Sequence, residues 1–85
     1  MMADLSDNGL VYIGDALIGE VFYWLSLDTE PGPVVAEGSI SGSEEMMRQI
    51  QAAQQVRLVL HDGPVFSLVP YGGSSGTRWV RLFAL

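Results

Sequence analysis

The sequence predicts an α+β fold: an antiparallel, strongly curved sheet or partly open barrel of about six strands with one helix, in the order β-β-β-α-β-β-β. Segments rich in β-branched and aromatic residues recur between glycine and proline turn signals. Only residues 41–55 have the apolar spacing typical of a helix. A chain of 85 residues supports one modest core. Residues 10–85 are therefore expected to form a single domain, preceded by a disordered tail over residues 1–9.

The first two strands are expected in the segments LVYIG (10–14) and ALIGEVFYWLSLD (16–28). Both are rich in residues that favour extended backbone, and Gly14-Asp15 between them is a turn signal. The second segment is long, and we expect it to bend at Gly19. These two segments therefore predict an antiparallel hairpin.

A loop and a third strand come next in the chain. Two prolines around a glycine in residues 28–33 exclude both strand and helix there, and VVAEGSI (34–40) has strand character. In the strand before this loop, Phe22, Tyr23 and Trp24 are consecutive. Because successive side chains of a strand point to opposite faces, aromatic rings must emerge on both faces of the sheet.

The predicted helix lies in SGSEEMMRQIQAAQQ (41–55). Ser41 or Ser43 can cap its start, and Glu44 and Glu45 in the first turn suit the helix dipole. An apolar stripe at helical spacing predicts that the helix packs on the sheet through one side. The residues of this stripe are Met46, Met47, Ile50 and Ala53.

The hairpin VRLVLHDGPVFSL (56–68) holds the only histidine, His61, beside Asp62. Asp62-Gly63 between apolar runs favours a two-residue type I′ turn, in which Leu60 faces Val65. In that register Val56, Leu58, Leu60, Val65 and Val69 share one face, while Val59, His61, Phe66 and Leu68 share the other. Neighbouring side chains on a strand point apart, so Asp62 is not expected to orient His61 as a triad acid does.

The final segment contains a Gly/Ser loop (72–76) and a sixth strand. The loop leads into a strand and not into a helix N-terminus, so a flexible hairpin connection is expected and not a phosphate cradle. Two sets of side chains alternate along the sixth strand. One set is Arg78, Val80 and Leu82, and the other is Trp79, Arg81 and Phe83.

Charge is segregated along the chain, whose formal net charge is −6. Residues 1–45 hold nine acids and no base, whereas residues 46–85 hold four arginines and one acid. Two interpretations are possible: the halves neutralise each other within one domain, or the acidic half meets a basic partner. Four arginines in a net acidic chain are a weak footprint for nucleic acid, so no direct nucleic-acid binding is expected.

Catalytic chemistry has little support in this composition. None of the eight serines sits in a Gly-x-Ser-x-Gly elbow, there is no lysine, and His61 is expected to be a hairpin-end residue. One histidine and no cysteine exclude a structural zinc site. We therefore predict a protein that is not an enzyme and has no catalytic residues, cofactor or metal. The absence of cysteine, an acidic start and the lack of a long apolar run favour a soluble cytoplasmic protein that does not enter a membrane.

The supply of large apolar side chains exceeds what one helix can cover, which indicates association. A helix of about 11 residues cannot shield all the aromatic residues of such a sheet. Four of them are the predicted partner-binding residues: Phe22, Trp24, Phe66 and Trp79. We expect a small protein-interaction module that binds a protein partner or a second copy of itself, most simply as a homodimer with Trp24 or Trp79 at its centre.

Two alternatives stay open. Barrel closure within a monomer would hide the same side chains. The acidic half also permits a different function, that of an inhibitor of a nucleic-acid-binding protein which imitates phosphate charge, as anti-restriction and anti-CRISPR proteins do. A row of carboxylates at phosphate-like intervals would favour mimicry, and carboxylates interleaved with arginines would argue against it.

Overall fold

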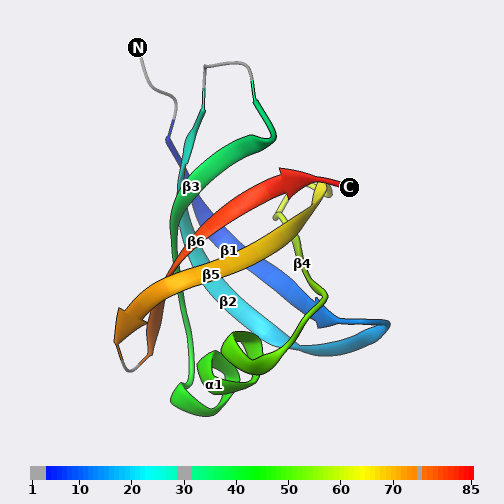
Figure 1. Cartoon of the computed structure of the whole chain (residues 1–85), viewed down its shortest axis with the longest axis vertical. Helices are drawn as coiled ribbons and strands as arrows, with labels where there is room; N and C mark the ends of the chain where they lie inside the picture. The colour runs from blue at the N-terminus through cyan, green and yellow to red at the C-terminus, as the bar shows by residue number, and fades with distance from the viewer. Residues whose placement is uncertain (1–3, 29–31, 75) are drawn as a thin grey trace.

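The computed structural model describes residues 4–28, 32–74 and 76–85 of the chain. Within these residues, six strands and one helix succeed each other in the predicted order (Figure 1). Their bounds are β1 Asp4–Ile13, β2 Ala16–Leu27, β3 Val34–Ser41, α1 Glu44–Ala52, β4 Val56–Val59, β5 Val65–Ser74 and β6 Thr77–Ala84. The antiparallel α+β fold class is thereby confirmed.

The described strands close into a barrel, with neighbours in the order β1-β2-β3-β6-β5-β4. Closure comes from antiparallel pairing of β1 with β4, in which Leu10 lies opposite Val59 and Ile13 opposite Val56. The prediction of a strongly curved sheet or partly open barrel is therefore wrong in this detail, because the barrel is closed. Closure converts one whole face of the sheet into an interior. A single helix could not have covered that face of an open sheet.

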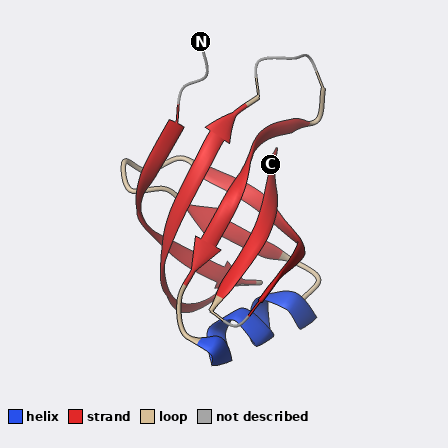
Figure 2. Ribbon diagram, turned by 90° about the vertical axis from the view of Figure 1, so that its left-hand side faces the viewer, coloured by secondary structure: helices blue, strands red, loops and turns tan. Residues whose placement is uncertain are grey.

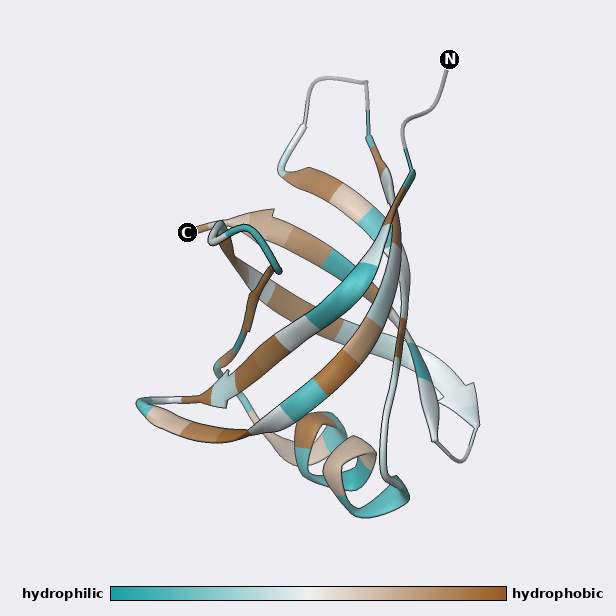
Figure 3. Cartoon of the chain, turned by 180° about the vertical axis from the view of Figure 1, so that it is seen from behind, coloured by the Kyte–Doolittle hydropathy of each residue, from teal (hydrophilic) through white to brown (hydrophobic). Residues whose placement is uncertain are grey.

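Alternation along each strand separates the core from the surface, and Figure 3 shows hydrophobic and hydrophilic residues alternating along the strands. In β2, Tyr23 is buried at 3% exposure, while Phe22 and Trp24 on either side of it point outward. The prediction that aromatic rings emerge on both faces of this strand is confirmed. The buried core consists of Val11, Val21, Tyr23, Leu25, Ala36, Ile40, Met47, Ile50, Val56, Leu58, Leu60, Leu68, Val80 and Leu82.

Helix α1 lies across one end of the barrel (Figure 2). Its N-cap is Ser43, whose hydroxyl accepts a hydrogen bond of 3.1 Å from the backbone N–H of Met46. Of the predicted apolar stripe, Met47 and Ile50 are fully buried and plug this end of the barrel. No helix in the described part of the chain has the length and apolar character needed to cross a bilayer.

A glycine permits the close approach of β2 and β3. Gly38 pairs with Leu25, and a Cβ at Gly38 would overlap the backbone carbonyl oxygen of Trp24. Only a residue without a side chain fits here. Gly38 therefore lets the sheet curve beside the exposed Trp24.

Strand β1 begins six residues earlier than expected, so the predicted tail over residues 1–9 is wrong for residues 4–9. Residues 4–9 pair with residues 21–26 of β2, and residues 1–3 lie outside the described part of the chain. The polar composition of residues 4–9 gives no strand signal in the sequence. Pairing with β2 makes this segment a strand despite its weak intrinsic propensity. The β1–β2 hairpin also has an irregularity at Ile18, next to the Gly19 where a bend was expected.

The connection between β4 and β5 is a three-residue loop, and the predicted two-residue turn is wrong. The N–H of Leu60 donates to the carbonyl oxygen of Pro64 (2.8 Å), and the N–H of Gly63 donates to that of Leu60 (3.0 Å). Gly63 has a φ of +111°, but no described non-glycine residue has a positive φ. A type I′ turn needs positive φ at Asp62 as well, so the loop comprises residues 61–63.

The additional loop residue shifts the β4–β5 register by one position. Leu58 lies opposite Phe66 and Val59 opposite Val65, where we expected Val59 to face Phe66. A shift of one residue exchanges the two faces of a strand. Phe66 consequently turns toward the interior, and Val65 turns toward solvent.

Strands β5 and β6 form the predicted final hairpin. Strand β5 continues to Ser74, so the connection is shorter than the loop expected over residues 72–76. Ser75 within it lies outside the described residues. In β6 the predicted alternation is confirmed: Val80 and Leu82 are buried, while Trp79 points outward.

Candidate functional site

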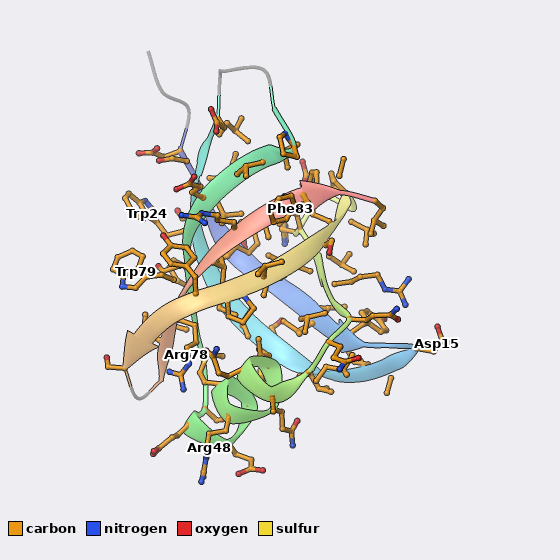
Figure 4. All side chains as sticks on the ribbon, in the orientation of Figure 1. Asp15, Trp24, Arg48, Arg78, Trp79 and Phe83 are labelled. Carbon is orange, nitrogen blue, oxygen red and sulfur yellow. The ribbon has the colours of Figure 1, made fainter. Side chains whose placement is uncertain are left out.

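Three of the four predicted partner-binding residues lie on one side of the barrel's outer surface. Phe22 and Trp24 come from β2 and Trp79 from β6, and their exposed fractions are 49%, 45% and 46%. In Figure 4 the two tryptophans lie near each other and point away from the barrel. Large aromatic groups rarely stay half exposed together unless the surface has a binding role.

Strand β3 separates the two tryptophans with a small side chain. Ser39 lies opposite Trp24 on one side and opposite Trp79 on the other. Neighbouring strands are about 4.8 Å apart, so the indoles flank Ser39 at equal strand distances. The surface is therefore low over β3 and raised on both sides.

A fourth aromatic residue, Tyr71 of β5, extends this surface and was not predicted. Its exposed fraction is 48%, and the Arg81 guanidinium lies 4.5 Å from the centre of its ring. Because Gly72 and Gly73 follow Tyr71 directly, the sequence predicted that a loop begins here and not that the strand continues. The alternation of Val69 with Tyr71, both exposed, was the available signal. We define the aromatic face as Phe22, Trp24, Tyr71 and Trp79.

Charges of both signs border the aromatic face. Arg81 lies opposite Glu37 in the β3–β6 ladder, and their side chains form an ion pair of 3.7 Å. Both side chains are about half exposed. The pair leaves this edge of the face without net charge, although the chain as a whole is strongly acidic.

Phe66, the fourth predicted partner-binding residue, is not part of the aromatic face. The β4–β5 register turns it inward, where it packs against the core at the barrel end opposite α1. There it lines a hollow of about 160 Å³. The predicted register did not indicate this inward position of Phe66, because it was wrong by one residue.

His61 interacts with a different acid from its neighbour in sequence. Its Nδ1 lies 3.6 Å from the carboxylate of Asp7 in β1, and its backbone N–H donates to the Tyr23 hydroxyl (3.1 Å). The hydroxyl of the buried Tyr23 thus anchors the β4–β5 loop to β2. Among the described residues, no three histidine, cysteine or acidic side chains gather as a metal-ligand set.

Comparisons with protein-family models, with curated proteins and with solved structures gave no match for this chain. Function must therefore be inferred from the side chains that the barrel presents. Two of the regions that present apolar groups are candidates for function: the aromatic face on the outer surface and the hollow at the end opposite α1.

Proposed function

We propose that this protein is a non-catalytic interaction module of the cytoplasm that forms a symmetric homodimer through its aromatic face. One observation carries the proposal: four aromatic side chains from three strands remain about half exposed on one side of a closed barrel. Closure has already filled the interior, and about half of each ring stays in water, even where Tyr71 contacts Arg81. Another surface is needed to cover them.

The exposed aromatic area suits a small interface. Aromatic side chains each present about 150–250 Å², so four half-exposed rings leave roughly 400 Å² in water. Two copies together contribute roughly 800 Å², and specific interfaces begin near roughly 1,000 Å² in total. Ser39, Glu37 and Arg81 border the rings and supply the remaining area.

The arrangement of the rings about Ser39 supports a two-fold dimer. A two-fold axis that runs along β3 above Ser39 exchanges the two sides of the face. Trp24 of each copy then meets Trp79 of the other copy, so one surface provides two aromatic contacts. The small side chain of Ser39 leaves room for close approach at the axis.

Charge also favours this face over the rest of the surface. Two chains of net charge −6 repel each other. The Glu37–Arg81 pair gives the part of the aromatic face over β3 and β6 charges of both signs. A second copy therefore meets less repulsion here than at a purely acidic surface.

The alternative function, mimicry of nucleic-acid charge, has less support. Arginines contact carboxylates at three separate places in the described part of the chain. These ion pairs are Arg48–Glu45 (3.2 Å), Arg57–Asp15 (3.4 Å) and Arg81–Glu37 (3.7 Å). Arginines interleaved with acids interrupt the continuous negative row that phosphate mimicry requires.

Sedimentation velocity over a hundredfold dilution tests the proposed dimer. The parent protein is expected to pass from dimer to monomer as it is diluted. Trp24→Ala and Trp79→Ala each remove a central aromatic contact, and such residues contribute at least about 2 kcal/mol, or roughly thirtyfold in Kd. Both variants should therefore sediment as monomers at concentrations where the parent is dimeric.

Leu17→Ala is the matched control. Leu17 lies on β2 and is 53% exposed, but it is near the β1–β2 turn and not part of the aromatic face. This variant should dimerise like the parent. A monomer mass for the parent at every concentration, or equal weakening by Leu17→Ala, would exclude the proposed interface.

A further inference from the structure

The two ends of the barrel are closed to different degrees. At one end Met47 and Ile50 of α1 are fully buried and cover the interior. At the other end the strand termini and the β4–β5 loop surround a hollow of about 160 Å³. Its walls are mostly apolar and include Leu25, Ala36, Leu60, Phe66 and Leu82.

The size of the hollow limits what it can hold. An apolar cavity of roughly 150 Å³ accepts a ligand as large as benzene. Side chains that line an empty space lose the dispersion contacts they would make with a filling group. An occupant with one aromatic ring, or an aliphatic chain of similar volume, would therefore restore contacts to Leu25, Phe66 and Leu82.

Charge at the hollow selects among such occupants. Of the described side chains that line it, Asp62 alone is charged, and none is an arginine. Among the described residues no basic group forms an ion pair with Asp62. In Figure 4 Arg48 and Arg78 lie toward the α1 end of the barrel. The hollow thus combines an apolar interior with a negative rim.

We propose that this hollow binds a small organic cation with an apolar body, such as an arylalkylamine. The ring would lie against Phe66 and Leu82, and the ammonium group would face the Asp62 carboxylate. The proposed site is separate from the aromatic face and does not depend on dimerisation.

The test is a titration of the ¹⁵N-labelled protein monitored by two-dimensional NMR, with three probes of similar shape. These probes are 2-phenylethylamine, the neutral 2-phenylethanol and the anion 3-phenylpropionate. Amide signals of residues around the hollow, including Leu25, residues 60–66 and Leu82, should shift with the amine. We expect the amine to bind most tightly, the alcohol less tightly and the anion least.

Two variants separate the contributions of charge and shape. Asp62→Asn should weaken amine binding about threefold, as expected for an exposed ion pair, and should leave alcohol binding unchanged. Ala36→Leu places a larger side chain in the hollow and should abolish binding of both. Asp15→Asn removes an acid at the distant β1–β2 turn and should change neither affinity.

Three outcomes would overturn the proposal. The first is the absence of shifts around the hollow with every probe, and the second is equal affinity for the amine and the anion. The third is retention of binding by a folded Ala36→Leu protein. Shifts confined to Trp24, Tyr71 and Trp79 would place the bound probe on the aromatic face and would also contradict the proposed site.

Discussion

The aromatic face and the hollow at the open end both present apolar side chains to water, but they differ in shape. The aromatic face lies on the outside of the barrel, and its four rings come from three strands. The hollow is concave and holds about 160 Å³. An open aromatic surface that spans several strands suits another protein surface, whereas a small concavity accepts only a small molecule or a single side chain. We therefore propose different binding partners for the two regions: a protein surface for the aromatic face and a small molecule for the hollow.

The two regions also differ in how strongly they are connected to the core. Residues of the aromatic face point away from the interior, and their truncation removes little packing within one chain. Most residues around the hollow belong to the core, as Leu25, Ala36, Leu60 and Leu82 do, or pack directly against it, as Phe66 does. We therefore expect substitutions at the hollow to change stability, and substitutions in the aromatic face to change association.

The largest expected effect on stability is that of Leu82→Ala. Leu82 is fully buried and also lines the hollow, so truncation removes its packing and enlarges an existing space. We expect a loss of about 3 kcal/mol in the free energy of unfolding, measured by denaturant titration. Val69→Ala on the exposed side of β5 should change it by less than about 0.5 kcal/mol. Equal effects of the two substitutions would show that the assigned interior is wrong.

A smaller effect is expected from Gly63→Val in the loop beside the hollow. Gly63 has a φ of +111°, which a β-branched residue adopts only with strain. The expected loss is about 1–2 kcal/mol, measured as a change in thermal unfolding. Unfolding at the parent's temperature would contradict the three-residue loop.

His61→Ala is the control for this loop. The His61 side chain is largely exposed and lies 3.6 Å from the Asp7 carboxylate, while the hydrogen bond from its backbone N–H to Tyr23 survives the substitution. Stability should stay within about 0.5 kcal/mol of the parent. Dimerisation should stay within about threefold, because a hairpin-end histidine contributes little beyond local packing.

The smallest effect has the opposite sign. Ala36→Leu adds apolar volume at the hollow and should stabilise the protein by about 0.5 kcal/mol, as cavity-filling substitutions commonly do. Denaturant titration in the absence of any ligand measures this change. A loss of more than about 1 kcal/mol would mean that the space is too tight for the added group.

Local sequence patterns predicted much of this fold because they depend on few residues. The order of elements, the cap near Ser43 and the inward and outward alternation of Phe22, Tyr23 and Trp24 arise from local rules. The same rules placed Trp24 and Tyr23 on opposite faces and Trp79 and Val80 on opposite faces, but they did not determine which face is the outer one.

Features that depend on distant pairing were predicted poorly. Closure requires β1 to meet β4, more than forty residues away, and no local signal encodes that contact. The loop at Gly63 is one residue longer than predicted, so the register of the whole β4–β5 pair differs by one. Phe66 therefore faces the interior, on the other side of the sheet from the one expected. Tyr71 was missed because adjacent glycines indicated a loop, although the pairing of its neighbours Pro70 and Gly72 with β6 keeps the segment extended.

Cross-linking at Ser39 tests the proposed two-fold interface most directly. The chain has no cysteine, so Ser39→Cys introduces one unique thiol at the expected axis. Sheets packed face to face lie about 10 Å apart, so a bis-maleimide with a spacer of about that length should join two copies. Gln51→Cys, on an exposed position of α1, is the matched control. The proposed interface predicts a covalent dimer from Ser39→Cys and almost none from Gln51→Cys. Monomeric adducts from both variants, or equal amounts of dimer, would contradict it.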